Sequence, residues 1–277
     1  MSSHYTGYAQ SQGIKLLEAA LLEYGPLFTL EQIKPLAVHQ NISTAQLRLL
    51  VSSLSASGWI EIIKRGTYMI KSPLYSGEVP PFAIASALVQ PLAISHWSAL
   101  AHHGFTTQIP GMVQASTPRK VVTPDMRLGK THRPRGRAVW RAAGVDVEFV
   151  YVQPSHFFGQ QQIWAGSWRQ VNITDPERTI LDLVARPGIF GGMQAAIEIA
   201  ERPISDIDVS KLVRYALQYH VGSVIKRLGW ILVQFNASAE IVEPLQRYPV
   251  TSYYRIDPSR SSHGKANSRW HIYENLD

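Results

Sequence analysis

The sequence contains no cysteine, so the chain can form neither disulfide bonds nor thiolate metal sites, and a reducing compartment suits it. It also lacks a Gly-rich phosphate-binding loop and a serine nucleophile elbow, the motifs of many nucleotide-binding proteins and hydrolases. Acidic residues are scarce, with 20 Asp and Glu against 27 Lys and Arg. The formal net charge of +7 therefore favours an anionic partner.

Apolar runs of membrane-spanning length are absent as well. The apolar stretch Phe82–Val89 is interrupted by Gln90 and Pro91 long before it could cross a bilayer. Residues Met1–Gln12 have neither the basic start nor the apolar core of a secretory signal peptide. We therefore expect a cytoplasmic protein with no membrane partner.

The first 75 residues have the pattern of a winged helix-turn-helix. Gly13–Glu23 carries apolar residues at the spacing of one helical face. Thr29 and Ser43 each open a further helix with a capping-box pattern. Two strand-like runs, Trp59–Ile63 and Thr67–Lys71, follow. Three helices and a hairpin in this order are typical of DNA-binding domains whose third helix enters the major groove.

The third predicted helix combines a leucine-rich core face with a polar face of short side chains and one arginine. The hairpin turn next to it adds two cations, at a place where phosphate contact is geometrically natural. An ordinary solvated helix face is the alternative for the polar residues taken alone. The residues predicted to contact double-stranded DNA are Thr44, Arg48, Ser52, Ser55, Lys64 and Arg65.

The positive charge is concentrated between residues 119 and 141. This segment holds eight cations and only Asp125 as an acid, and its net charge of +7 equals that of the whole chain. Proline and glycine residues interrupt it, which indicates loops and hairpin tips. A solvated loop is one interpretation, and a surface for DNA, RNA or an acidic protein is the other. The cations of this predicted partner surface are Arg119, Lys120, Arg127, Lys130, Arg133, Arg135, Arg137 and Arg141.

The remainder of the chain predicts a larger mixed α/β region, which makes the whole protein α+β. Residues 72–81 are rich in Pro, Gly and Ser and indicate a linker. We expect a DNA-binding domain over 1–75 and a C-terminal domain over 76–277, with a sub-boundary near residue 170. Ser95 is expected to cap one helix and Asp175 another, the latter with a proline at the first helical position.

Three further segments show a resemblance to a known family. Ile94–Gly104, Val171–Leu183 and Gly264–Asn275, in this order and spacing, resemble the AbiEi-type antitoxins, transcriptional regulators of bacterial abortive-infection systems. The resemblance spans nearly the whole chain. It implies an autorepressor that binds an operator of inverted repeats. It also implies a C-terminal antitoxin domain that counteracts an AbiEii-type nucleotidyltransferase toxin in a type IV system, without requiring a stable complex.

Enzymatic interpretations depend on clusters of acids. Asp175, Glu177, Arg178 and Asp182 begin one predicted helix and suggest a carboxylate-bound metal. We interpret Asp175 instead as a cap, Glu177 as an acid favoured by the helix dipole, and Asp182 as a surface residue. Asp125 and Glu148 resemble the pair of acidic residues of a nuclease active site only loosely.

The residue two positions after Glu148 is Val150, where a nuclease site needs a lysine. His96, His102 and His103 invite a zinc interpretation, but adjacent histidines on a helix point about 100° apart and converge poorly on one ion. We therefore expect a non-enzyme without a cofactor or metal. A winged-helix-targeted nuclease and a protein-binding winged-helix adaptor stay open as alternatives.

Overall fold

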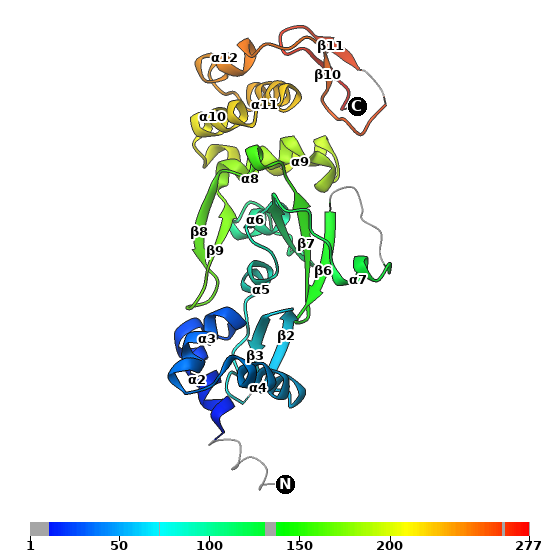
Figure 1. Cartoon of the computed structure of the whole chain (residues 1–277). Helices are drawn as coiled ribbons and strands as arrows, with labels where there is room; N and C mark the ends of the chain where they lie inside the picture. The colour runs from blue at the N-terminus through cyan, green and yellow to red at the C-terminus, as the bar shows by residue number, and fades with distance from the viewer. Residues whose placement is uncertain (1–10, 72, 131–136, 262–263, 277) are drawn as a thin grey trace. The chain divides into compact units, whose positions relative to one another are not determined.

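The computed structural model describes residues 11–71, 73–130, 137–261 and 264–276 (Figure 1). They form two compact units, which are described separately. Unit 1 comprises the described residues of Met1–Leu92, Val121–Glu148 and Gln162–Val171, and unit 2 those of Ala93–Lys120, Phe149–Gln161 and Asn172–Asp277. The mixed α+β class predicted from the sequence is confirmed. The predicted boundary after residue 75 and the sub-boundary near 170 stay predictions.

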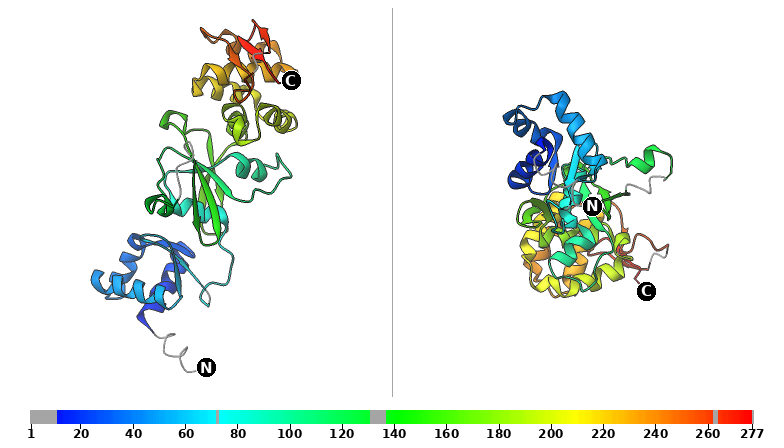
Figure 2. Two further views of the ribbon diagram at one scale, coloured as in Figure 1. Left: turned by 90° about the vertical axis from the view of Figure 1, so that its right-hand side faces the viewer. Right: turned by 90° about the horizontal axis from the view of Figure 1, so that it is seen from below.

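Unit 1 begins with helices and a small sheet. In chain order these elements are α2 (Gln12–Tyr24), β1 (Leu27–Thr29), α3 (Leu30–His39), α4 (Thr44–Ala56), β2 (Ile60–Lys64) and β3 (Thr67–Ile70). The sheet is antiparallel with the order β1-β3-β2. Figure 2 shows the three helices, in blue, gathered in one cluster. The predicted helices and hairpin are confirmed, whereas the short strand β1 was not predicted.

Local sequence explains where these helices begin. Thr29 Oγ1 accepts a hydrogen bond from Gln32 N at 3.2 Å, and Gln32 Oε1 accepts one from Thr29 N at 2.8 Å. Ser43 and Gln46 make the same reciprocal pair at the start of α4. Both predicted capping boxes are thus confirmed, and each satisfies amide groups that have no partner within the helix.

Unit 1 also contains elements from later in the chain. Helix α5 (Pro81–Leu88) is apolar and packs against β1 and β2. The short helix α7 (Pro124–Arg127) is capped by Thr123, whose side chain accepts from Met126 N at 3.2 Å. Burial of α5 against the small sheet means that the region after residue 75 continues the packing of the N-terminal elements.

A larger mixed sheet has the strand order β6-β7-β5-β4-β9-β8. Strand β4 runs antiparallel to β5 and parallel to β9, with Ile94 opposite Ala115 and Ile173. Helix α6 (His96–His102) packs on β5. The strands are β4 (Ala93–Ile94), β5 (Val113–Thr117), β6 (Arg137–Ala142), β7 (Val145–Tyr151), β8 (Gln160–Trp164) and β9 (Gln170–Thr174).

The C-terminal part of unit 2 is a helical layer followed by a small sheet. The helices are α8 (Pro176–Ala185), α9 (Met193–Glu201), α10 (Val209–Tyr219), α11 (Gly222–Gln234) and α12 (Ala239–Arg247). The sheet, of order β10-β12-β11, consists of β10 (Tyr254–Arg255), β11 (Lys265–Asn267) and β12 (Ile272–Glu274). Helix α12 was not predicted.

Trp270 joins the small C-terminal sheet to α11. It is 1 % exposed, and a Cβ atom at Gly229 would overlap its ring. Only glycine therefore permits this contact between helix and indole. Within the described residues, no helix is long and apolar enough to cross a membrane.

Candidate nucleic-acid interface

Helix α4 separates its apolar and polar side chains as the sequence predicts. Leu47, Val51 and Leu54 are buried in the core of unit 1. On the opposite side, Thr44, Arg48 and Ser52 are exposed, and Ser55 is half-buried. The predicted base-contacting residues of α4 therefore lie together on one accessible face, because they follow the helical repeat.

A groove of about 460 Å³ runs between this face and the hairpin. Arg48, Ser52 and Ser55 line it on the helix side, and Ile62 and Tyr68 line it on the strand side. The last two lie opposite each other in the β2–β3 register. Sequence reasoning missed both, although the alternation of side chains along a two-stranded hairpin could have placed them on one face.

The two cations of the hairpin turn differ in their surroundings. Arg65 is exposed. Lys64 is half-buried, and its Nζ donates a hydrogen bond to the carbonyl oxygen of Leu88 at 2.8 Å. Burial and the nearby charge of Arg169 lower the pKa of Lys64. The Lys64 amine is thus partly engaged within the protein, whereas the Arg65 guanidinium faces solvent.

Arg169 is a cation near the hairpin that sequence reasoning did not select. Its Nε donates to Ser86 Oγ at 2.7 Å, and burial lowers its pKa. Arg169 and Lys64 are more than 100 residues apart in sequence, so no local pattern signals that their charges interact.

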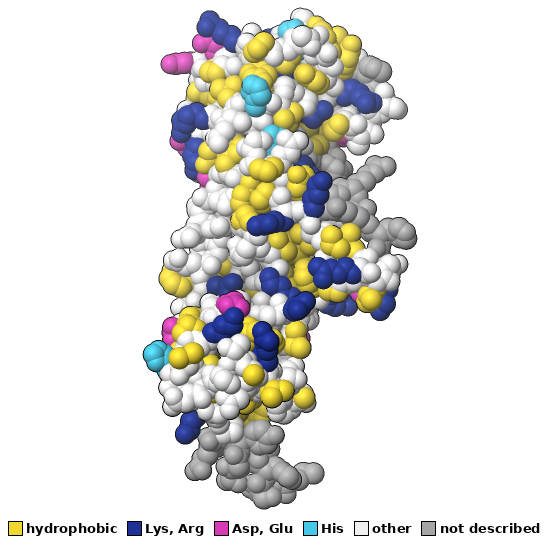
Figure 3. Space-filling view, in the orientation of Figure 1, with side chains coloured by type: hydrophobic (Ala, Val, Ile, Leu, Met, Phe, Trp, Pro, Cys, Tyr) yellow, Lys and Arg dark blue, Asp and Glu magenta, His cyan; other side chains and the backbone are white. Residues whose placement is uncertain are grey.

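The basic segment, residues 119–141, is divided between the two units. Arg119 and Lys120 belong to unit 2, whereas Arg127, Lys130 and the strand residues of β6 belong to unit 1. Arg133 and Arg135 lie outside the described residues. Arg119, Lys120, Arg127, Lys130 and Arg141 are exposed, and Arg137 is half-buried. On the face in Figure 3, Lys and Arg side chains are more frequent than acidic ones.

Two acids outside residues 119–141 also oppose this charge. The guanidinium of Arg141 donates two hydrogen bonds of 2.6 Å to the carboxylate of Asp146. Arg137 lies 3.4 Å from Glu148. The reason is that β6 pairs with β7, so the strand that follows the segment brings two acids against it. The positive surface is therefore smaller than the sequence count indicates.

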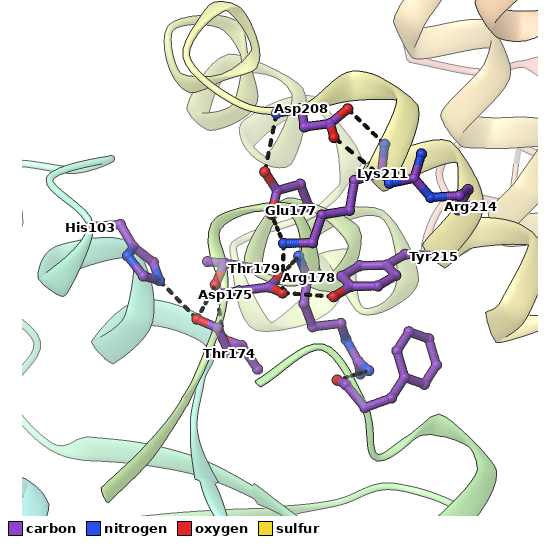
Figure 4. A network of polar contacts seen from close by, with 11 residues as sticks. His103, Thr174, Asp175, Glu177, Arg178, Thr179, Asp208, Lys211, Arg214 and Tyr215 are labelled. Atoms are coloured by element: carbon purple, nitrogen blue, oxygen red, sulfur yellow. Dashed lines mark hydrogen bonds and ion pairs between the residues drawn. The ribbon is translucent and has the colours of Figure 1, made fainter. Parts of the chain in front are cut away.

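A network of charged side chains joins α8 to α10 (Figure 4). Asp175 caps α8 as predicted, accepting from Arg178 N at 2.8 Å. Lys211 Nζ on α10 lies 3.0 Å from Asp175 and 2.7 Å from Glu177. Burial alone would lower the pKa of Lys211, but its hydrogen bonds to Glu177 and Asp175 raise it above its ordinary value. Both carboxylates thus share the ammonium of one lysine.

Tyr215 completes the network from α10. Its hydroxyl donates to Asp175 Oδ2 at 2.7 Å. Burial and this hydrogen bond raise the pKa of Tyr215 to about 12. The contacts hold two helices together, which is a structural role.

The interpretation of Asp182 as a surface residue is wrong. Its side chain is 3 % exposed and pairs with Arg178, whose side chain is 2 % exposed. The guanidinium of Arg178 also donates to the carbonyl oxygens of His156 at 2.6 Å and Phe158 at 3.1 Å. Asp182 is buried because the segment of His156 and Phe158, which lies 20 or more residues upstream, packs over this face of α8, and helical periodicity alone does not reveal this.

The histidines in α6 and at its C-terminal cap have separate surroundings. The Nδ1 atom of His96 is 2.7 Å from Ser95 Oγ, and Nε2 of His103 is 2.8 Å from the carbonyl oxygen of Thr174. Ser95 occupies the N-cap position of α6 as predicted, but its side chain makes no capping hydrogen bond, because its hydroxyl bonds the His96 ring. Within the described residues, no group of three His, Asp or Glu residues has the geometry to hold a metal ion.

Comparison with solved structures finds a protein of similar fold. The fold is similar to the crystal structure of the RV2827C protein from Mycobacterium tuberculosis, with a TM-score of 0.61 and 15 % sequence identity. The match covers 95 % of this chain and 91 % of that chain. At this identity the likeness shows the fold alone. No protein-family model and no curated protein matches the sequence.

Proposed function

We propose that the chain is a sequence-specific DNA-binding repressor whose N-terminal elements act as a winged helix-turn-helix. Helix α4 is the recognition helix, and the β2–β3 hairpin is the wing. The observation that carries the proposal is the accessible groove shared by the polar face of α4 and by the hairpin. In this arrangement Arg48, Ser52 and Thr44 reach base edges in the major groove.

The wing supplies contacts of a different kind. Arg65 is exposed at the hairpin turn, where it contacts a phosphate without reading sequence. Lys64 contributes less, because its amine already donates to Leu88. Tyr68 lies in the groove beside α4 and offers a hydroxyl and a ring face to the DNA backbone.

We further propose that this repressor is the antitoxin of a toxin–antitoxin operon, in line with its resemblance to the AbiEi-type antitoxins. The three segments that carry the resemblance lie in unit 2, except for Val171. His96, Arg178 and Trp270, one from each segment, are buried. These segments thus maintain the fold of the C-terminal region, which counteracts a nucleotidyltransferase toxin. The proposal includes no enzymatic activity of the chain itself.

Selection of bound fragments from random double-stranded DNA tests the proposal. The wild-type protein is expected to enrich a defined sequence, and Arg48→Ala to lose the enrichment. Lys15→Ala is the matched control, because Lys15 is an exposed cation of α2 in the same unit. Enrichment of no sequence by the wild type, or equal enrichment by Arg48→Ala, would contradict the proposal.

A further inference from the structure

A pocket of about 280 Å³ lies between helix α11 and the small C-terminal sheet, within unit 2. Figure 1 shows β10 beside α11, in the part of the chain coloured orange to red. Two arginines and three tyrosines dominate the lining, which consists of Arg227, Tyr253, Tyr254, Arg255, Pro258 and Tyr273.

Arg227 in this pocket is buried but has few partners. It is 8 % exposed, and its Nε donates to the carbonyl oxygen of Arg255 at 2.9 Å. A guanidinium has five N–H donors. Within the described part of the chain, the two terminal nitrogens of Arg227 have no hydrogen-bond partner. Neither of these nitrogens is completely buried. They therefore reach the solvent of the pocket.

The charge of Arg227 is also poorly compensated. It forms no ion pair with any described carboxylate. The nearby acid, Asp257, is instead held by Met193 N at 3.1 Å and Ser259 N at 2.8 Å. Burial lowers the pKa of Arg227 to about 10. A buried cation without a paired anion is costly, so this position favours an anionic ligand.

The aromatic side of the pocket is open. Tyr253 is 38 % exposed, although its ring centroid lies 5.3 Å from that of Tyr273 and 5.2 Å from that of His271. The parallel pairing of β10 with β12 sets Arg255 opposite Tyr273 and so places arginine and tyrosine side chains together. An exposed aromatic face next to a cation is the combination that binds nucleobases with their phosphates.

We propose that this pocket binds a nucleoside phosphate, with the phosphate on Arg227 and the base stacked on Tyr253. The same chemistry occurs in a free nucleotide and at the phosphorylated end of a nucleic-acid strand. The site is independent of the proposed operator binding, which uses unit 1.

Isothermal titration of the full chain with AMP, adenosine, inorganic phosphate and a 5′-phosphorylated oligoribonucleotide tests the proposal. AMP is expected to bind more tightly than adenosine or inorganic phosphate. Arg227→Gln is expected to weaken AMP binding by about tenfold or more, as for other hydrogen bonds to charged groups. Tyr253→Ala is expected to weaken AMP binding and leave phosphate binding unchanged. Tighter binding of the oligoribonucleotide than of AMP assigns the site to strand ends, and weaker binding assigns it to free nucleotides.

The control variant is Arg247→Gln, which changes an exposed arginine of α12 and is expected to bind AMP like the wild type. Absence of AMP binding by the wild type at millimolar concentration would overturn the proposal, as would unchanged affinity in folded Arg227→Gln. If Arg227→Gln does not fold, Tyr253→Ala decides, because Tyr253 is exposed. Unchanged AMP affinity in that variant would refute the site. Operator binding is expected to persist in both variants.

Discussion

Arg178 and Asp182 lie one turn apart on α8 and form an ion pair of 3.0 Å in which both side chains are almost completely buried. Arg178 makes further bonds to backbone carbonyls of the segment that covers α8. The pair therefore connects a helix to a loop far away in sequence. Its cost of desolvation is offset only while both partners and these carbonyls are present.

Removing one partner of this pair is expected to destabilise the protein strongly. Asp182→Ala leaves the charge of Arg178 buried with fewer partners, and we expect a loss of about 3–5 kcal/mol of unfolding free energy. Urea denaturation measures it. The matched control is Glu243→Ala, which breaks an exposed i,i+4 pair with Arg247 on α12 and should cost at most about 1 kcal/mol. Similar losses in the two variants would contradict the role given to burial.

Substitution of Arg48 and substitution of the wing cations are expected to affect DNA binding differently. Arg48→Ala should weaken binding to the selected sequence by about 1–3 kcal/mol and relax the preference at the contacted base. Arg65→Ala should weaken binding to all sequences alike and reduce the slope of log affinity against log salt by about one. Gel-shift titrations at several salt concentrations measure both.

Lys64 provides an internal comparison for the wing. Because its Nζ already donates to Leu88, Lys64→Ala should change the salt slope less than Arg65→Ala does. Wild-type affinity in Arg48→Ala, Lys64→Ala and Arg65→Ala together would exclude α4 and the hairpin as the DNA-binding surface.

The basic segment is expected to act on the toxin side or on RNA rather than on the operator. The double variant Arg127→Gln/Lys130→Gln removes two exposed cations of unit 1. It should bind the operator normally and protect cells less well from the toxin. Arg141→Gln should have a smaller effect, since Asp146 already neutralises Arg141. Loss of operator affinity in the double variant would assign the segment to DNA binding. Normal operator binding together with normal protection from the toxin would show that these cations contact only solvent.

Stability is expected to fall at alkaline pH through Tyr215. The ordinary pKa of 10.0 is raised to about 12 in the folded protein, so the folded state holds the phenolic proton more tightly than the unfolded state does. The contribution of Tyr215 is therefore complete below pH 10 and is lost as the pH rises toward 12.

Tyr215→Phe removes this titration and should flatten the decrease in urea midpoint above pH 10. Tyr248→Phe is the control, because Tyr248 lies on the C-terminal side of α12 and does not contact Asp175. An unchanged pH profile in Tyr215→Phe would contradict the coupling between Tyr215 and Asp175.

The sequence by itself determined the local features of this protein. The capping boxes at Thr29 and Ser43, the buried leucines of α4 and the cap at Asp175 depend on residues within a few positions of each other. Such interactions operate within one or two helical turns, so periodicity and capping patterns predict them. The class of the fold and the polar face of α4 follow from the same patterns.

Only the tertiary structure decided which charges are paired. Lys64 donates a hydrogen bond to the carbonyl oxygen of Leu88, and Arg178 donates one to that of Phe158. Arg137 forms an ion pair with Glu148. Each contact depends on how strands and helices pack, because the partners come from different elements of the fold. The same holds for the pocket of Arg227, which α11 shares with a sheet nearly 30 residues later in the chain. Packing thus determined where positive charge remains available for a partner.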